Sequence, residues 1–209
     1  MKVIIEHCES ILSKWLWFEY SNCSKIVGKD NLIFTNVRED EISNKLSRLG
    51  IVFNESIISL VNRGAFNCNE IIILDLEATT PLGPLDFKGY TKVVIGGILG
   101  DHPPKGRTYK LITSRLPNCV SRNLGPYQFS IDGAAYVALQ VSLGRSLDEI
   151  PIALGFKIKV NEFHEIYLPY AFPIVDDKPL VSRDLIEYLK SNEIVEDELK
   201  SIQSSLHEA

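Results

Sequence analysis

An uninterrupted apolar run, Ile71-Ile72-Ile73-Leu74, is the feature that most constrains the fold of this chain. A strand that is apolar on both faces must be covered on both sides, as in parallel sheets flanked by helices. A second apolar run, residues 93–95, ends in two glycines, whose missing side chains allow a ligand or another backbone to approach closely. These two runs favour an α/β fold with its site near the ends of buried strands.

Segments with strand-like and helix-like patterns alternate along most of the chain. The expected strands are residues 2–6, 31–35, 70–76, 91–98 and 118–121. The expected helices are residues 10–27, with Ser10 as cap and Gly28 as stop, 39–49, closed by Gly50, 56–62, 107–114 and 131–143. This order predicts a mostly parallel sheet with helices on both faces.

The pattern changes after Gly144. Residues 156–160 and 163–168 alternate around Asn161-Glu162 and predict a hairpin, while residues 182–191 and 193–207 predict two helices. We therefore divide the chain into a main domain, residues 1–145, and a small C-terminal extension of hairpin and helices, residues 146–209. Within the extension, the aromatic and proline-rich residues 167–173 form either a rim over a ligand crevice or a packed surface segment.

Composition narrows the possible partners and compartment. The chain has 209 residues with 22 basic and 27 acidic side chains, a net charge of −5, which does not favour a large nucleic-acid footprint and slightly favours a basic partner. The four cysteines lack metal-binding spacing, so we expect no metal and free thiols in a reducing compartment. Without a signal peptide or a membrane-spanning run, the expected location is the cytoplasm.

Three loops leave predicted strands at their carboxyl ends, residues 75–84, 96–107 and 122–130, and each contains glycine and proline. The carboxyl ends of parallel strands are the usual ligand crevice of open α/β folds. The first strand lacks a following G-x-G-x-x-G, and the chain lacks a G-K-[ST] motif. The common modes of binding dinucleotides and nucleoside triphosphates are therefore disfavoured.

The second of these loops carries the run IGGILGDHPPKGRT, residues 95–108. It resembles the signature of the knotted SPOUT methyltransferases, and within them an archaeal and fungal branch whose fungal members methylate an arginine of a small-subunit ribosomal protein. Two further places agree with that branch: residues 4–7 with Trp15 and residues 19–21, and residues 121–125 with Asp132. A weaker likeness, through Leu116-Pro117, joins the chain to tRNA purine-N1 methyltransferases of the same class.

The resemblance implies a deep trefoil knot in which the three loops cradle S-adenosyl-L-methionine. Arg107 or Arg122 then pairs with the cofactor carboxylate, unless it is a plain surface charge. The residues expected to contact the cofactor are Leu76, Gly97, Gly100, His102, Arg122, Leu124, Gly125, Gln128 and Ser130.

Methyl transfer to arginine requires carboxylates that orient the guanidinium, because its high pKa makes the free group a poor nucleophile. Asp101 is the first candidate, since its loop should adjoin the cofactor, and Glu19 is the second. His102 either orients Asp101 or shapes the loop. His7, at the end of the first strand, is either catalytic or a hydrogen-bonded structural histidine.

The sequence is compatible with more than one class of methyl acceptor. The leading hypothesis is an arginine of a basic ribosomal protein, which would suit an acidic entrance formed by Glu6 and Glu9. Five basic residues and no acidic one lie between His102 and Ile131, which would suit tRNA or rRNA. A third hypothesis is a knotted domain that binds cofactor or RNA without catalysis, and the sequence fits either a monomer or a homodimer.

Overall fold

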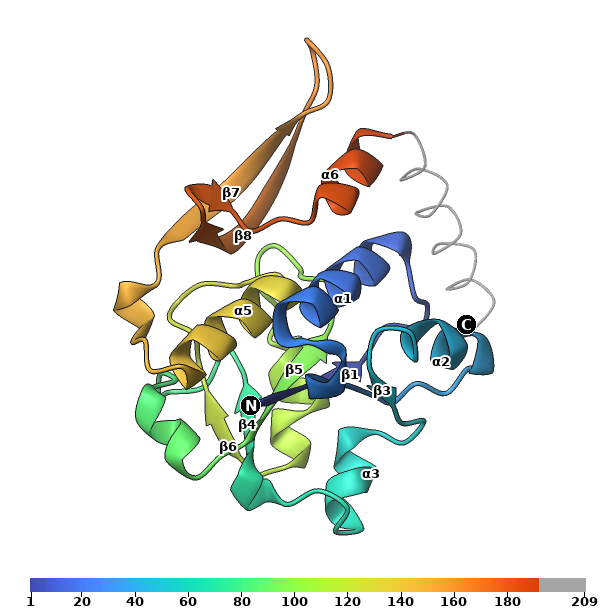
Figure 1. Cartoon of the computed structure of the whole chain (residues 1–209), viewed down its shortest axis with the longest axis vertical. Helices are drawn as coiled ribbons and strands as arrows, with labels where there is room; N and C mark the ends of the chain where they lie inside the picture. Colours follow the sequence, from blue (N-terminus) through green and yellow to red (C-terminus); the bar gives the residue numbers. More distant parts are fainter. Residues whose placement is uncertain (192–209) are drawn as a thin grey trace.

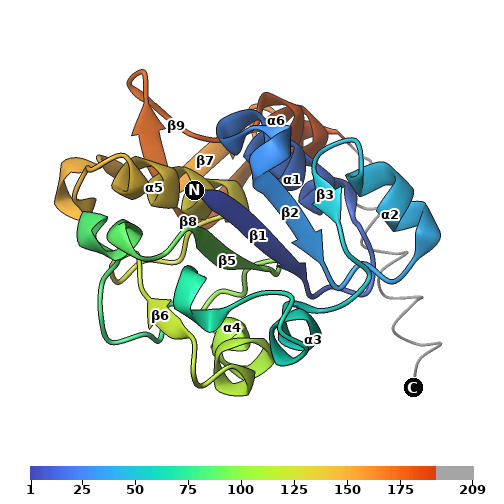
Figure 2. The same cartoon turned by 60° about the horizontal axis from the view of Figure 1, so that its bottom comes forward.

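The computed structural model describes residues 1–191 and contains a six-stranded, wholly parallel sheet. Its strands are β1 (Lys2–His7), β2 (Leu32–Thr35), β3 (Ile51–Val52), β4 (Ile71–Leu74), β5 (Lys92–Gly97) and β6 (Val120–Arg122). The order across the sheet is β3-β2-β1-β5-β4-β6, and Figure 2 labels all of these strands except β4. The predicted α/β class is confirmed, and the short strand β3 is an addition that the sequence patterns did not indicate.

Helices cover both faces of the sheet, as the apolar runs require (Figure 2). One face carries α1 (Lys14–Val27), α2 (Asp40–Leu46) and α5 (Ile131–Ser142), and the other carries α3 (Ile57–Asn62) and α4 (Arg107–Leu111). Alternate residues of β1, β2, β4 and β5 enter the two apolar clusters: Ile72 and Leu74 pack toward α5, and Ile71 and Ile73 toward the α3 side. The sheet is therefore the middle of three layers.

The start of α1 differs from the prediction. Ser13, not Ser10, is the N-cap, and its hydroxyl accepts a hydrogen bond from the Leu16 amide at 3.2 Å. Residues 8–13 form the connection from β1 instead of the first helical turn. Gly28 ends the helix as expected, at a φ of 84° that glycine adopts without strain.

The C-terminal segment forms a second, antiparallel sheet. Its elements are β7 (Ile152–Lys159), β8 (Glu165–Val175), β9 (Lys178–Pro179) and α6 (Arg183–Lys190). The β7–β8 hairpin projects from the main body, and α6 lies beside it (Figure 1). The predicted hairpin is confirmed with longer strands, whereas the helix predicted at residues 193–207 lies outside the described residues.

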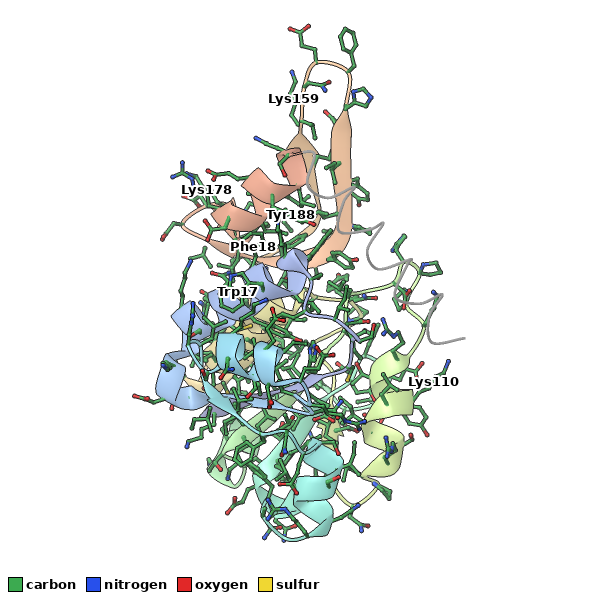
Figure 3. All side chains as sticks on the ribbon, turned by 90° about the vertical axis from the view of Figure 1, so that its right-hand side faces the viewer. Trp17, Phe18, Lys110, Lys159, Lys178 and Tyr188 are labelled. Atoms are coloured by element: carbon green, nitrogen blue, oxygen red, sulfur yellow. A yellow bond between two sulfur atoms is a disulfide. The ribbon has the colours of Figure 1, made fainter. Side chains whose placement is uncertain are left out.

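Helix α6 joins this segment to the main sheet through α1. The rings of Phe18 on α1 and Tyr188 on α6 are 5.7 Å apart, and both belong to an apolar cluster with Leu168 and Phe172 of β8 (Figure 3). Residues 167–173 are therefore part of a strand that is packed on both faces at residues 171–173.

The cysteines are not all free, contrary to the expectation from their spacing. Cys68 and Cys119, just before β4 and β6, form a disulfide, while Cys8 and Cys23 are free thiols. The isolated positions of these cysteines in the sequence concealed the pair, because β4 and β6 become neighbours only in the folded sheet. Within residues 1–191, no helix is both long enough and apolar enough to cross a membrane.

Candidate active site

A cavity of about 170 Å³ lies at the carboxyl ends of β4, β5 and β6. The three loops that follow these strands form its walls, as predicted. Its apolar lining comes from Leu74, Leu76, Ile95, Ile98, Leu124, Phe129, Ile131 and Ala134. Its charged lining comes from Asp75, Glu77, Asp101, Lys105 and Arg107. Such a cavity suits a ligand that has an apolar ring and charged groups of both signs.

Asp101 lies on the loop between β5 and α4 and faces the cavity. Its carboxylate accepts a hydrogen bond from Lys105 Nζ at 2.8 Å, and Arg107 Nη1 is 3.8 Å away. The hydrogen bond from Lys105 is the main cause that lowers the pKa of Asp101, so this carboxyl is ionised at neutral pH.

Arg107 and Glu9 brace the same loop from the side of β1. Arg107 Nη2 is 3.0 Å from Glu9 Oε1, and Arg107 Nη1 donates to the Leu99 carbonyl at 3.2 Å. Glu9 Oε1 also accepts from the Leu99 amide at 2.9 Å. Glu9 is thus engaged in shaping the loop, which the sequence patterns did not indicate.

The loop after β4 contributes two further carboxylates. Asp75 is buried and accepts hydrogen bonds from the Thr113 hydroxyl at 2.6 Å and from the Glu77 amide at 3.0 Å. The Glu77 carboxylate lies against Gly106, where a β-carbon would collide with it, and Gly106 has a φ of 63°. The absence of a side chain at Gly106 therefore leaves room for the Glu77 carboxylate at the cavity wall.

The loop after β6 closes the remaining side. Asn123 ties it to the β4 loop by donating from its amide to the Thr80 carbonyl at 2.9 Å and from Nδ2 to the Ala78 carbonyl at 2.7 Å. Gly125 follows with a φ of 92°, which favours glycine. The loop ends at Ser130, the N-cap of α5, whose hydroxyl accepts from the Gly133 amide at 3.2 Å.

Glu19 does not line this cavity. Its carboxyl accepts hydrogen bonds from Trp15 Nε1 at 2.7 Å and from the Ile131 amide at 3.0 Å. Burial, followed by the nearby charge of Asp132, raises the pKa of Glu19 to about 8. Asp132 is also buried and accepts from Asn22 Nδ2 at 2.7 Å. Glu19 thus connects α1 to the first turn of α5, a helix of which two residues line the cavity.

His7 and Glu6 are buried away from the surface. The His7 Nδ1 atom is 3.0 Å from the Tyr20 hydroxyl, and burial lowers the pKa of His7 to about 4. Glu6 accepts from the Thr35 hydroxyl at 2.5 Å and from the Ile57 amide at 2.8 Å. The expected acidic entrance is therefore wrong for Glu6, which instead holds β2 and the start of α3.

Most of the predicted site residues line the cavity, namely Asp101, Leu76, Gly100, Leu124, Gln128 and Ser130. Besides Glu19, four do not. Arg122 donates to both carboxylate oxygens of Asp86, the closest contact at 2.9 Å, and is turned away. Gly97 packs on Tyr20, where a β-carbon would collide with the hydroxyl. His102 is exposed outside the lining, and Gly125 lies just beyond Leu124.

Sequence reasoning missed several lining residues, above all Glu77, Lys105 and Tyr127. Lys105 lies inside the motif that identified the loop, and Glu77 is an acidic residue shortly after the end of β4. A charged side chain in a loop that follows a parallel strand is the signal that marks both. Of the two candidate arginines, the structure places Arg107 in the cavity.

Three comparisons with known proteins agree with this architecture. A family model described as "SFM1-like: Protein arginine N-methyltransferase SFM1-like" matches residues 2–195, which includes the C-terminal segment. "Protein arginine N-methyltransferase SFM1" of Saccharomyces cerevisiae (strain ATCC 204508 / S288c) is 29% identical over 203 residues, covering 92% of this chain and 95% of that protein.

Solved structures show the same likeness. The crystal structure of the yeast arginine methyltransferase SFM1 complexed with SAM superposes with a TM-score of 0.82 at 28% identity, covering 90% of this chain and 89% of that chain. The dual specific Trm10 from Thermococcus kodakaraensis shares the fold, with a TM-score of 0.55 at 17% identity over 71% of this chain and 96% of that chain.

The parallel sheet, with its cavity at the carboxyl ends of β4, β5 and β6, has the fold of the SPOUT methyltransferases. Within this class, the chain belongs to the SFM1-like family of protein arginine N-methyltransferases.

Proposed function

We propose that this chain transfers a methyl group from S-adenosylmethionine to an arginine side chain of a protein. The observation that carries the proposal is the cavity between the three loops, whose lining combines apolar surface with both acidic and basic side chains. The yeast enzyme that was solved in complex with SAM has the same fold over most of both chains.

The residues present fit such a cofactor. Leu76, Leu124 and Phe129 provide apolar surface for a purine ring, and the loop backbone provides hydrogen-bonding groups for its edge. Arg107 and Lys105 suit the carboxylate of the amino-acid part. The bound cofactor supplies an electrophilic methyl group on a sulfonium.

The acceptor needs negative charge at the cavity, and two residues supply it. Asp101 is ionised, and its partner Lys105 is largely exposed, so an incoming guanidinium can replace this weak surface pair. Glu77, on the facing loop, offers a second carboxylate. Together they would hold the guanidinium by charge-assisted hydrogen bonds, orient one nitrogen, and receive or relay the proton that it loses.

The remaining candidates take supporting roles in this proposal. Glu19 supports the cavity from outside its lining, because it accepts a hydrogen bond from the Ile131 amide at the start of α5. Gly100, Leu124, Gln128 and Ser130 form the cofactor wall with Leu76. The exposed His102 shapes its loop, and the trefoil knot and the boundary at residue 145 remain predictions.

The charges favour a basic protein over RNA as the acceptor. Of the five basic residues between His102 and Ile131, Lys105 and Arg107 line the cavity, where we assign them to the cofactor carboxylate, and Arg122 pairs with Asp86. These three are thus less available to phosphates. A basic ribosomal protein is the acceptor that we favour, which would place the reaction in the cytoplasm.

The decisive experiment incubates the protein with methyl-labelled S-adenosylmethionine and separated ribosomal proteins or ribosomal and transfer RNA. We expect label in a basic ribosomal protein and methylarginine after its hydrolysis. Label in RNA alone would refute the arginine assignment. Cofactor binding without label in either fraction would favour a non-catalytic domain.

A further inference from the structure

Strand β8 of the C-terminal segment touches two of the three cavity loops through adjacent residues. The Tyr170 hydroxyl donates a hydrogen bond to the Gly100 carbonyl at 2.7 Å. The Ala171 amide donates to the Gln128 carbonyl at 2.8 Å, where Phe129 and Ala171 form an isolated parallel bridge. The loop after β5 and the loop after β6 are thereby attached to the same strand.

The three segments meet tightly at Gly100. A β-carbon on Gly100 would collide with the Gln128 side-chain amide and would lie 2.6 Å from the Tyr170 ring. Gly100 and Gln128 both line the cavity, whereas Tyr170 stands behind them. The side of the cavity that bears Gly100 and Gln128 therefore depends on a residue outside the three loops.

The surroundings of Tyr170 keep its hydroxyl available as a hydrogen-bond donor to the Gly100 carbonyl. Tyr170 is partly buried, and its ring lies edge-on to Phe172 with the ring centres 6.5 Å apart. Burial, and after it the charges of Glu19 and Asp101, raises the pKa of Tyr170, so its hydroxyl keeps its proton at neutral pH.

We propose that Tyr170 is a positioning residue of the cofactor site: by holding the Gly100 carbonyl, it keeps the Asp101 loop in register with the Gln128 loop. The C-terminal segment is then part of the methyltransferase site and not an appendage to it. This inference rests on the function proposed above, because its readout is binding of S-adenosylmethionine.

The test replaces Tyr170 by phenylalanine, which removes the hydroxyl and keeps the ring against Gly100. Tyr167→Phe is the matched control, because Tyr167 lies on the same strand, is 58% exposed and does not line the cavity. Calorimetry with S-adenosylmethionine should give a Kd about fivefold to tenfold higher for Tyr170→Phe, and an unchanged Kd for the control. The KM for the cofactor should rise in parallel, with kcat changed less than about twofold.

Amide hydrogen exchange gives a second, local readout. Residues 98–106 should exchange faster in Tyr170→Phe than in the control, while α1 and α2 exchange alike in both proteins. Unchanged affinity and unchanged exchange in Tyr170→Phe would refute the positioning role. Equal losses in both variants would also refute it, since they would reflect general weakening of the hairpin. Failure of the unaltered protein to bind S-adenosylmethionine would instead refute the proposed function.

Discussion

Asp101 and Glu77 face the same cavity, but the protein holds them differently. Lys105 and Arg107 pair with Asp101 within its own loop, whereas the exposed Glu77 carboxylate lies in the space left by Gly106. Asp101 is thus already ionised and can exchange one cation for another. Glu77 adds charge from the opposite loop, so the two residues can be separated by experiment.

Asp101→Asn removes the charge and keeps the shape. We expect kcat to fall at least about a hundredfold, because an amide cannot hold and orient a guanidinium as a carboxylate does. Affinity for S-adenosylmethionine should stay within a few fold. Steady-state kinetics and calorimetry check the two parts, and a fully active variant would remove Asp101 from the mechanism.

Glu77→Gln should act on the acceptor more than on the cofactor. The KM for the acceptor should rise about tenfold through the loss of one charged hydrogen bond, with the KM for S-adenosylmethionine unchanged. Glu41→Gln on α2, which does not line the cavity, is the control. An acceptor KM equal in both variants would assign Glu77 to loop structure alone.

Glu19 makes folding stability depend on pH. Its pKa is raised from 4.5 to about 8, so between these values the folded protein retains a proton that the unfolded chain releases, and the free energy of unfolding falls as pH rises. His7, whose pKa is lowered to about 4, gives the opposite slope below about pH 6.5.

Because burial also raises the pKa of the neighbouring Asp132, the pH range between about 7 and 8 reports on the Glu19–Asp132 pair. Urea unfolding should show stability that declines over this range in the unaltered protein, by at most about 1.4 kcal/mol per pH unit. Glu19→Gln should be less stable at neutral pH but nearly independent of pH. An equally steep decline in the variant would mean that another group carries the proton.

At the scale of elements, periodicity located most helices and strands but not their ends. The helix predicted from Ser10 begins at Lys14, because Ser13 and not Ser10 meets a free amide of the first turn. Both serines precede apolar positions at helical spacing, so the pattern could not choose between them. The two-residue strand β3 is too short to produce any alternation.

This difference gives a paired test. Ser13→Ala should lower the free energy of unfolding by about 1 kcal/mol through the loss of the cap. Ser10→Ala, at an exposed position in the connection, should leave it unchanged. Urea titrations of the two variants decide, and the reverse order of effects would place the cap at Ser10.

At the scale of the whole molecule, the motif located the site. The sequence could not show which residues from distant parts of the chain contact the motif and the loops around it. Arg122 is among the expected cofactor contacts, but the fold places Asp86 beside it. Gly97 is one of the motif glycines, yet β1 and α1 bring Tyr20 against it. Such partners lie far apart in the chain, and local spacing does not encode their meeting.

The Cys68–Cys119 disulfide also joins segments that are distant in the chain. It spans 51 residues, which in the chain-entropy description stabilises the fold by about 4 kcal/mol. Reduction, or the double change Cys68→Ser with Cys119→Ser, should therefore lower the denaturant midpoint. Cys23→Ser is the control for the loss of a buried thiol. An unchanged denaturant midpoint on reduction would indicate that the disulfide contributes little to stability.

Strand β1 lies in the middle of the sheet, with β2 on one side and β5 on the other. During synthesis on the ribosome, β2 emerges soon after β1, but β5 follows only after β3 and β4 have been made. One edge of the most apolar part of the sheet must therefore wait unpaired while translation proceeds. The order of the strands therefore predicts that the centre of the sheet is completed only after β5 has been synthesised.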